Sequence, residues 1–209
     1  MTRSPQWWRS TALVLVLFTM GGCAADSFQL ADGQHHGRGV KMSVGDVDIG
    51  SDCRLEGNID LAAGNIVVGE RSVIEGDIVV QKGNVRLAAG VQVRSVTVID
   101  GVIELGAGAT SFGTITMTDG LITVNGATIG GLVALQNGRL EVNAGSNLNA
   151  GLQVVNSRPG RADSTTVVVA ATARVAGTVG FGGRVKLLID PAADIREAAF
   201  TDLLRAGHE

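Results

Sequence analysis

The chain has 209 residues, a formal net charge of −3, 30 glycines and only 3% aromatic residues. This charge excludes the strongly basic class of nucleic-acid-binding proteins, and two cysteines are too few for a disulfide framework. Because 45% of the residues are hydrophobic, the chain can form a core, which excludes a disordered protein.

Residues 1–22 have the features of a secretory signal peptide. Arg3 and Arg9 give a positively charged start, and Ala12–Met20 is an apolar run too short to span a bilayer. We therefore expect export from the cytoplasm. The run is followed by Gly21-Gly22-Cys23.

The segment that ends in Cys23 resembles the lipobox of bacterial lipoproteins, with Met20 in place of the usual leucine. This resemblance implies cleavage before Cys23 and acylation of that cysteine with palmitate-like chains, which anchor a protein firmly in a membrane. Ala24 after the cysteine implies the outer membrane, facing the periplasm. The alternative is an ordinary cleaved signal peptide.

Residues 23–44 are rich in glycine and polar residues and show no period, which predicts a flexible tether. The pair His35-His36 lies in this segment. Adjacent side chains of an extended chain point apart, and no third ligand is evident, so we expect solvated histidines and no metal site.

Residues 45–190 are organised by a repeat, and six glycines mark it at intervals of 19, 19, 18, 19 and 18 residues: Gly45, Gly64, Gly83, Gly101, Gly120 and Gly138. The second and fourth residues after each glycine are aliphatic: Val47/Ile49, Ile66/Val68, Val85/Leu87, Ile103/Leu105, Ile122/Val124 and Leu140/Val142. A second apolar pair has the same period: Ile59/Leu61, Ile78/Val80, Val96/Val98, Ile115/Met117, Val133/Leu135 and Leu152/Val154. Alternation at period two predicts strands with one buried face, and the constant spacing predicts a single-stranded parallel β-helix, or β-solenoid.

A third apolar position recurs at the corner between these pairs: Leu55, Ile74, Val93, Ile129 and Leu148. The fourth cycle is irregular because it has Ser111-Phe112 there. Three apolar clusters in 18 or 19 residues favour a triangular coil. After Val154 the polar segment Asn156–Ser164 predicts an inserted loop, beyond which the apolar alternation resumes as far as Ile189.

Residues 191–209 predict a short amphipathic helix over Pro191–Arg205 that caps the last coil. Asp190 precedes Pro191 as a helix-capping residue would, and Ile195, Ala199 and Leu203 form an apolar stripe at helical spacing. The alternative is an interfacial membrane helix, which the few basic residues on its polar face disfavour.

The repeats show no catalytic constellation, so we expect neither an enzyme nor a bound cofactor or metal. All three histidines lie outside the repeats: His35, His36 and His208. Two outward rows were compared for stacked acids: Asp48, Val67, Arg86, Glu104, Thr123, Glu141 and Asp60, Val79, Thr97, Thr116, Ala134, Gln153. Neither row brings two acids together in successive coils, as paired-carboxylate chemistry requires. Asp46, Asp48 and Asp52 resemble a calcium loop only faintly, because Gly50 replaces a ligand.

Two weak binding features remain. Thr97 and Thr116 are neighbours in one outward row, with Thr114 and Thr118 beside them. Regular threonine rows on flat solenoids can bind ice or sugar, although this row is two coils long and ends at Ala134. Arg158 and Arg161 form the one localised basic feature, on the inserted loop.

Cys53 lies two residues before Leu55 and should share its inward face. Such a thiol acts as a small hydrophobic side chain rather than as a reactive group.

The repeated pattern in GNIVVGERSVIEGDIVVQKGNVRLAAGVQV resembles that of the bactofilins and related bacterial polymer-forming β-helix proteins. The resemblance covers Gly45 to about Ile189, and the segment TTVVVAATARVAGTVGFGGRVKLLID is also similar to a group of uncharacterised proteobacterial lipoproteins. It implies a right-handed triangular β-helix that polymerises end to end without nucleotide. The chain departs from the bactofilins in its export signal and in its candidate helical cap.

We therefore expect a lipid-anchored, non-catalytic structural or scaffolding protein of the bacterial cell envelope. Its expected partners are the membrane, through the lipid, and other copies, through the solenoid ends. An envelope polysaccharide is an alternative partner, and nucleic acid is not expected. The alternative functions are a polysaccharide-binding or polysaccharide-modifying β-helix and an adhesin.

Overall fold

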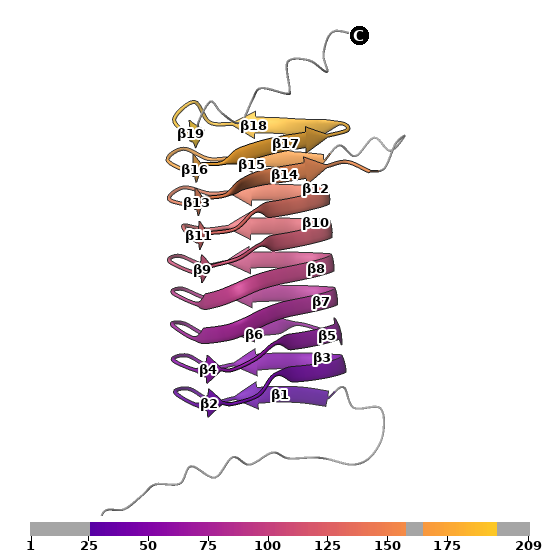
Figure 1. The fold of residues 1–209 in the computed structure, drawn as a ribbon, viewed down its shortest axis with the longest axis vertical. Coiled ribbons are helices and arrows are strands. Elements are labelled where there is room, and N and C mark those ends of the chain that lie inside the picture. The colour runs from indigo at the N-terminus through magenta and orange to yellow at the C-terminus, as the bar shows by residue number, and fades with distance from the viewer. Residues whose placement is uncertain (1–25, 158–164, 196–209) are drawn as a thin grey trace, which may run out of the picture.

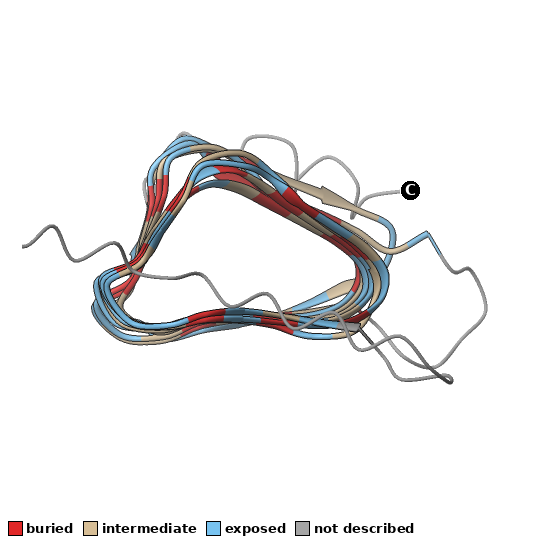
Figure 2. Cartoon of the chain, turned by 90° about the horizontal axis from the view of Figure 1, so that it is seen from below, coloured by how far each residue is buried: buried red, intermediate tan, exposed pale blue. Residues whose placement is uncertain are grey.

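The computed structural model describes residues 26–157 and 165–195, which form nineteen strands and no helix. The strands wind around one axis as a rod of stacked coils (Figure 1). Seen along the axis, the coils superpose as a rounded triangle (Figure 2). The prediction of an all-β, single-stranded parallel β-solenoid is therefore confirmed.

The three sides of the triangle are three ladders. The first side stacks β1 (Asp26–Leu30), the end of β3 (Val40–Ile49), β6 (Ile66–Val68), the ends of β7 (Val73–Leu87), β8 (Gln92–Leu105), β10 (Ile115–Val124) and β12 (Val133–Val142), then β15 (Thr165–Val169) and β18 (Val185–Ile189). The short second side stacks β2 (His35–His36), β4 (Arg54–Leu55), the starts of β7 and β8, β9 (Thr110–Ser111), β11 (Thr128–Ile129), β13 (Asn147–Leu148), β16 (Arg174–Val175) and β19 (Asp194–Ile195). The third side stacks the start of β3, β5 (Ile59–Ala63), the middles of β7 and β8, the starts of β10 and β12, β14 (Gly151–Val155) and β17 (Thr178–Gly182).

Every ladder between these strands is parallel, and its register follows the sequence repeat. Ile66 pairs with Val47 in the preceding coil and with Val85 in the next, and Val85 pairs with Ile103. The inserted loop lengthens one step, because Leu140 pairs with Val167 rather than with a residue 18 or 19 positions later. Nine coils stacked at about 4.8 Å make a rod of about 40 Å.

The core is a column of inward side chains with no solvent exposure in the central coils. The predicted apolar pairs are buried, as Ile66, Ile103 and Ile122 illustrate at 0% exposure. The corner before the second side is narrow and takes small side chains in nearly every coil: Cys53, Ser72, Val91, Ala109, Ala127, Ser146 and Ala173. Cys53 is 2% exposed, so its predicted burial is confirmed.

The irregular fourth cycle keeps the register by turning its serine inward. Ser111 pairs with Val93 and Ile129, the two aliphatic residues that hold the same position in neighbouring coils. Its buried hydroxyl is within 3.3 Å of the carbonyl oxygens of Arg94 and Gly113. Because consecutive strand residues point to opposite faces, Phe112 is directed outward and is 63% exposed.

The repeated glycines form a ladder at the corner between the third and first sides. Gly83 has φ 143°, and a Cβ atom built on it would overlap the carbonyl oxygen of Gly64 in the preceding coil. The same overlap recurs at Gly101 and Gly120. Only glycine adopts this conformation and permits so close a backbone approach, which explains the fixed position of glycine in the repeat.

The prediction of a flexible tether over residues 23–44 is wrong from Asp26 onward, because this segment is the first coil of the solenoid. Asp26 pairs with Gly45, His36 with Leu55 and Val40 with Ile59. The coil keeps both apolar pairs, as Phe28/Leu30 and Val40/Met42, but His36 takes the place of the corner leucine. Asp32 and Gly33, which had suggested a flexible segment, form a turn between two strands of this coil.

The predicted capping helix is wrong for residues 191–195, and residues 196–209 lie outside the described part of the chain. Asp190 does accept a hydrogen bond from the backbone N–H of Ala192, at 2.8 Å. The chain then continues as a corner turn and as β19, in which Ile195 pairs with Val175. The hydrogen bond from Ala192 to the Asp190 side chain thus stabilises a turn and does not begin a helix.

Candidate binding surface

The outer surface changes in character along the rod. Residues 26–104, the charged half, contain 12 acidic and 7 basic residues, whereas residues 105–157, the charge-poor half, contain only Asp119, Arg139 and Glu141. The charge-poor half has six of the seven threonines in these two segments. The two halves share one core pattern, so their difference lies in the side chains presented to solvent.

One coil of the charge-poor half carries a line of outward threonines interrupted by an aromatic ring. In the segment 110–118 the even positions face outward: Thr110, Phe112, Thr114, Thr116 and Thr118. Ser111, Ile115 and Met117 between them are buried. We call the outward set the threonine stripe; it follows β9 and β10 around the corner between the second and third sides.

Threonines of neighbouring coils widen the stripe on both sides. Thr116 pairs with Thr97, and Thr110 pairs with Thr128. The sequence prediction that Thr97 and Thr116 adjoin is therefore confirmed, as is the end of that row at Ala134. The outward direction of Phe112, which puts an aromatic ring in line with these threonines, was not predicted from the sequence.

The ring of Phe112 stands between two different neighbours. In the preceding coil, Arg94 is held by Asp77 through contacts of 2.8 and 2.5 Å, and this hydrogen bonding lowers the pKa of the Asp77 carboxyl group. In the next coil, Gly130 and Gly131 follow the same backbone path without side chains. One flank of the ring therefore has a fixed ion pair, and the other has bare backbone.

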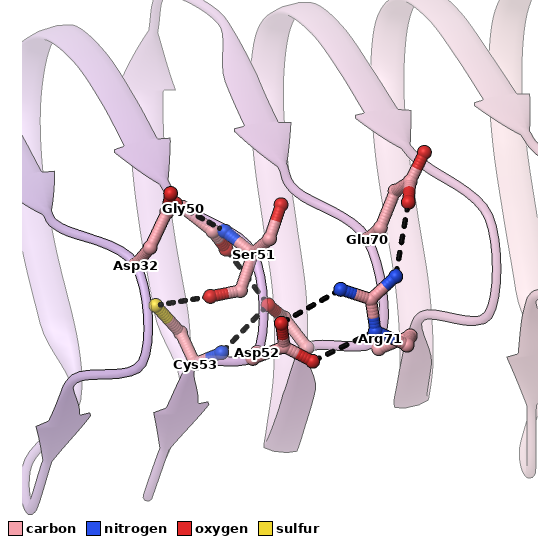
Figure 3. A network of polar contacts seen from close by, with 8 residues as sticks. Asp32, Gly50, Ser51, Asp52, Cys53, Glu70 and Arg71 are labelled. Carbon is pink, nitrogen blue, oxygen red and sulfur yellow. Dashed lines mark hydrogen bonds and ion pairs between the residues drawn. The ribbon is translucent and has the colours of Figure 1, made fainter.

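A different polar network lies at the corner before the second side in the charged half (Figure 3). Arg71 donates two hydrogen bonds to the Asp52 carboxylate, at 2.8 and 2.7 Å. The pair lowers the pKa of Asp52 and raises that of Arg71, chiefly through these hydrogen bonds. Both residues have φ 57°, at a position where most coils use glycine. The ion pair thus joins two coils through residues in a conformation that side chains disfavour.

Behind this ion pair the small inward residues are fully bonded to backbone. Ser72 Oγ donates to the carbonyl oxygen of Gly50 at 2.7 Å and accepts from the N–H of Cys53 at 2.9 Å. The Cys53 thiol contacts the carbonyl oxygen of Ala31 at 3.1 Å. Ser146 repeats the serine arrangement with Val124 and Gly126. These bonds hold successive corners together and expose no nucleophile.

The histidine pair lies on β2 rather than on a linker. His35 Nε2 is 2.9 Å from Glu56 Oε1, and the His36 ring meets the edge of Phe28 with centroids 5.0 Å apart. Both histidines line a hollow of about 580 Å³ at the N-terminal end, together with Phe28 and Gly37–Val40. Within the described residues no group of three potential metal ligands occurs.

The two acidic rows behave as the sequence predicts. Asp48 pairs with Gln29 and Val67, and Glu104 pairs with Arg86 and Thr123. A stacked acid pair does occur in a row that was not compared, at the corner beside the glycine ladder. There Asp100 pairs with Asp119, and Lys82 and Asn137 continue the same row.

Three predicted site residues lie outside the described residues: Cys23, Arg158 and Arg161. The part of the chain that the structure describes contains no helix able to cross a membrane. Comparison of the chain with protein-family models, with curated proteins and with solved structures found no significant match. A function for this chain therefore has to be inferred from its sequence, its fold and its surface.

Proposed function

We propose that this chain is a lipid-anchored, non-catalytic structural or scaffolding protein of the bacterial cell envelope, in the outer membrane and facing the periplasm. The observation that carries the proposal is the proximity of Cys23 to the rod. Asp26, the first residue of β1, follows Cys23 by three positions. A fully extended chain of this length spans about 11 Å.

A lipid on Cys23 would therefore hold the N-terminal end of the rod against the membrane surface. The remaining coils would project from that end, up to the full length of about 40 Å. Such a rod is stiff because each coil is bonded to its neighbours by backbone ladders along three sides. A stiff spacer with a defined distance from the membrane suits a scaffold.

Membrane attachment can be tested by replacing one residue. The wild-type chain should incorporate radiolabelled palmitate and sediment with outer-membrane fractions. Cys23→Ala should abolish labelling. If the signal peptide is still cleaved, the variant should be soluble in the periplasm; if it is not cleaved, the signal peptide should hold the variant in the inner membrane. Cys53→Ala is the matched control and should retain labelling, because Cys53 is buried. Unchanged labelling of Cys23→Ala would contradict the proposal.

Self-association through the solenoid ends is a further part of the proposal. The outer edges of β1 and β18 have no strand partner within the described residues, and such edges favour pairing with another chain. Sedimentation of the purified chain in detergent at increasing concentration should reveal assemblies. A strict monomer at all concentrations would remove this part, and protease shaving of intact cells would reveal an adhesin instead.

A second candidate function is binding of an envelope polysaccharide, which the charge-poor half favours. Its hydroxyl and amide side chains suit a ligand that offers hydroxyl groups. Titration of the full chain with peptidoglycan and with envelope glycans tests this function. Absence of binding to every one of them would reject it.

A further inference from the structure

We infer that the threonine stripe is a binding site for an uncharged polysaccharide, with Phe112 as the residue on which one sugar ring stacks. This inference rests on the second candidate function above and assigns it a site and a ligand class. The observation that carries the inference is that the one strongly exposed phenylalanine of the described residues lies within the threonine stripe.

Phe112 differs from the other phenylalanines that the structure describes. Phe28 and Phe181 pack against the hydrophobic core, whereas Phe112 is 63% exposed. Its outward direction follows from the inward position of Ser111, so the core gains nothing from this ring. An aromatic face carries partial negative charge and attracts the polarised C–H groups on one face of a sugar ring.

The surroundings of the ring leave room for such a ligand. Gly130 and Gly131 in the next coil present backbone without side chains beside it. On the other flank, Asp77 holds Arg94 by two hydrogen bonds, which restrains the guanidinium group. A sugar ring could therefore approach Phe112 from the glycine side without displacing a side chain.

The stripe also supplies a line of hydroxyl groups beyond the ring. The chain bends at Phe112 and Gly113, and the straight part from Thr114 to Thr118 covers about 13 Å, enough for a short run of sugar units. Each threonine hydroxyl donates one hydrogen bond and accepts others, as sugar hydroxyls do. Thr97 and Thr128 extend the hydroxyl surface into the adjoining coils.

Charge distribution selects an uncharged ligand over an acidic or basic one. Between residues 105 and 138 the only ionisable side chain is Asp119, so no cluster of arginine or lysine faces the stripe from the next coils. Among the described residues, the positive charge next to Phe112 is Arg94, which is already paired with Asp77 and so offers little to an acidic polysaccharide. A basic polymer would be attracted instead to the acidic groups of the charged half.

The experiment is a titration of the full chain, in a detergent without a sugar headgroup, observed by isothermal calorimetry. The probes are the N-acetylglucosamine hexasaccharide, a glucose hexasaccharide and, as the charged comparison, a galacturonic acid hexasaccharide. We expect one of the two uncharged probes to bind and the acidic probe to bind at least tenfold more weakly. Phe112→Ala should weaken binding of the uncharged probe about tenfold, from loss of the stacking contact.

Two variants separate the site from general effects on the fold. Thr116→Val keeps the shape of the side chain and removes its hydroxyl group, so it should weaken binding severalfold. Val67→Ala removes an exposed apolar side chain from the charged half and should leave binding unchanged. Circular dichroism should show the same thermal unfolding for all variants.

The outcomes distinguish the site from the function. Binding that Phe112→Ala leaves unchanged would overturn the site while keeping the polysaccharide function. Absence of binding to all three probes, to peptidoglycan and to envelope glycans would overturn both. A dimer of the wild-type chain that Phe112→Ala dissociates would show that the ring contacts a second copy, and this would also overturn the inference.

Discussion

The charged half and the charge-poor half have the same core but different surfaces. Ile66 in the first and Ile122 in the second hold the same inward position, and both are fully buried. Outward, the first half is joined by ion pairs such as Arg86 with Glu104, whereas the second presents threonine and asparagine. The comparison shows that the core and the glycine ladder define the coil, which leaves the outer face free to change.

The largest effect should come from the glycine ladder, and it should be equal in both halves. Gly83→Ala and Gly120→Ala each place a Cβ atom against a carbonyl oxygen of the preceding coil, at φ 143° and 137°. We expect each to destabilise the fold by more than about 4 kcal/mol in urea denaturation.

Gly180→Ala is the matched control for the ladder, because a Cβ atom there meets no atom within 4 Å. Its effect should stay within about 0.5 kcal/mol. A mild effect of Gly83→Ala would show that the coils can separate at this corner, and the repeat would then need another explanation.

The next effect concerns the buried aliphatic pairs. Ile66→Ala and Ile122→Ala should each cost about 2–5 kcal/mol, because each removes side-chain volume from a packed column and leaves a cavity. Urea denaturation of both variants measures the cost, and Val67→Ala on the outer face is the control. Costs that differ strongly between the two would mean that the halves are not equivalent in packing.

A smaller effect should appear only in the charged half, at low pH. The pKa values of Asp52 and Asp77 lie below the ordinary 3.8, since Arg71 and Arg94 hydrogen-bond their carboxylates. Folded carboxylates that resist protonation stabilise the fold above pH 3.8, and this contribution disappears as the pH falls through the lowered pKa values. Stability should therefore fall between about pH 5 and pH 2.

A double variant isolates this contribution. Asp52→Asn with Asp77→Asn should melt a few degrees below the wild type at neutral pH, as measured by circular dichroism. The melting temperatures of the two chains should converge as the pH falls through the lowered pKa values of these two carboxyl groups. A constant difference at all pH values would show that the asparagines act by another route.

The smallest effect should come from the outer face of the charge-poor half. Thr97→Val and Thr116→Val should change stability by less than about 0.5 kcal/mol, because valine fits a strand as well as threonine does. Urea denaturation measures this difference. A loss above about 1 kcal/mol would mean that the threonine hydroxyl groups support the coil, rather than being available for a ligand.

Several features of the surface were beyond prediction for identifiable reasons. Ser111 is polar and Phe112 is apolar, so hydrophobicity alone would place the phenylalanine inside. The ladder decides otherwise, because Val93 and Ile129 in neighbouring coils fix which residue of the pair points inward. The alternation of Thr114, Thr116 and Thr118 is visible in the sequence, whereas the place of Phe112 among the outward residues depends on this register.

The two ends of the rod were mispredicted for a related reason. The first described coil keeps the apolar pairs of the repeat but loses two of its markers, the ladder glycine and the corner aliphatic residue, which is His36. Asp26 takes the place of a ladder glycine, because no carbonyl group of an earlier described coil lies against it. Asp190 and Pro191 suggest a helix start, yet the spacing to Arg174 and Val175 lets the following residues pair as β19.

The sequence alone determined the architecture, the length of each coil and the identity of nearly all core residues. It could do so because stacking places each residue above its counterpart one repeat earlier, so that local alternation and period carry the long-range contacts. Only the tertiary structure decided where the described rod begins, which way Ser111 and Phe112 point, and that Phe112 lies among the outward threonines. Those outcomes depend on the register of the backbone ladders between coils. An outer face accommodates side chains of either polarity, so the polarity of a residue does not reveal that register.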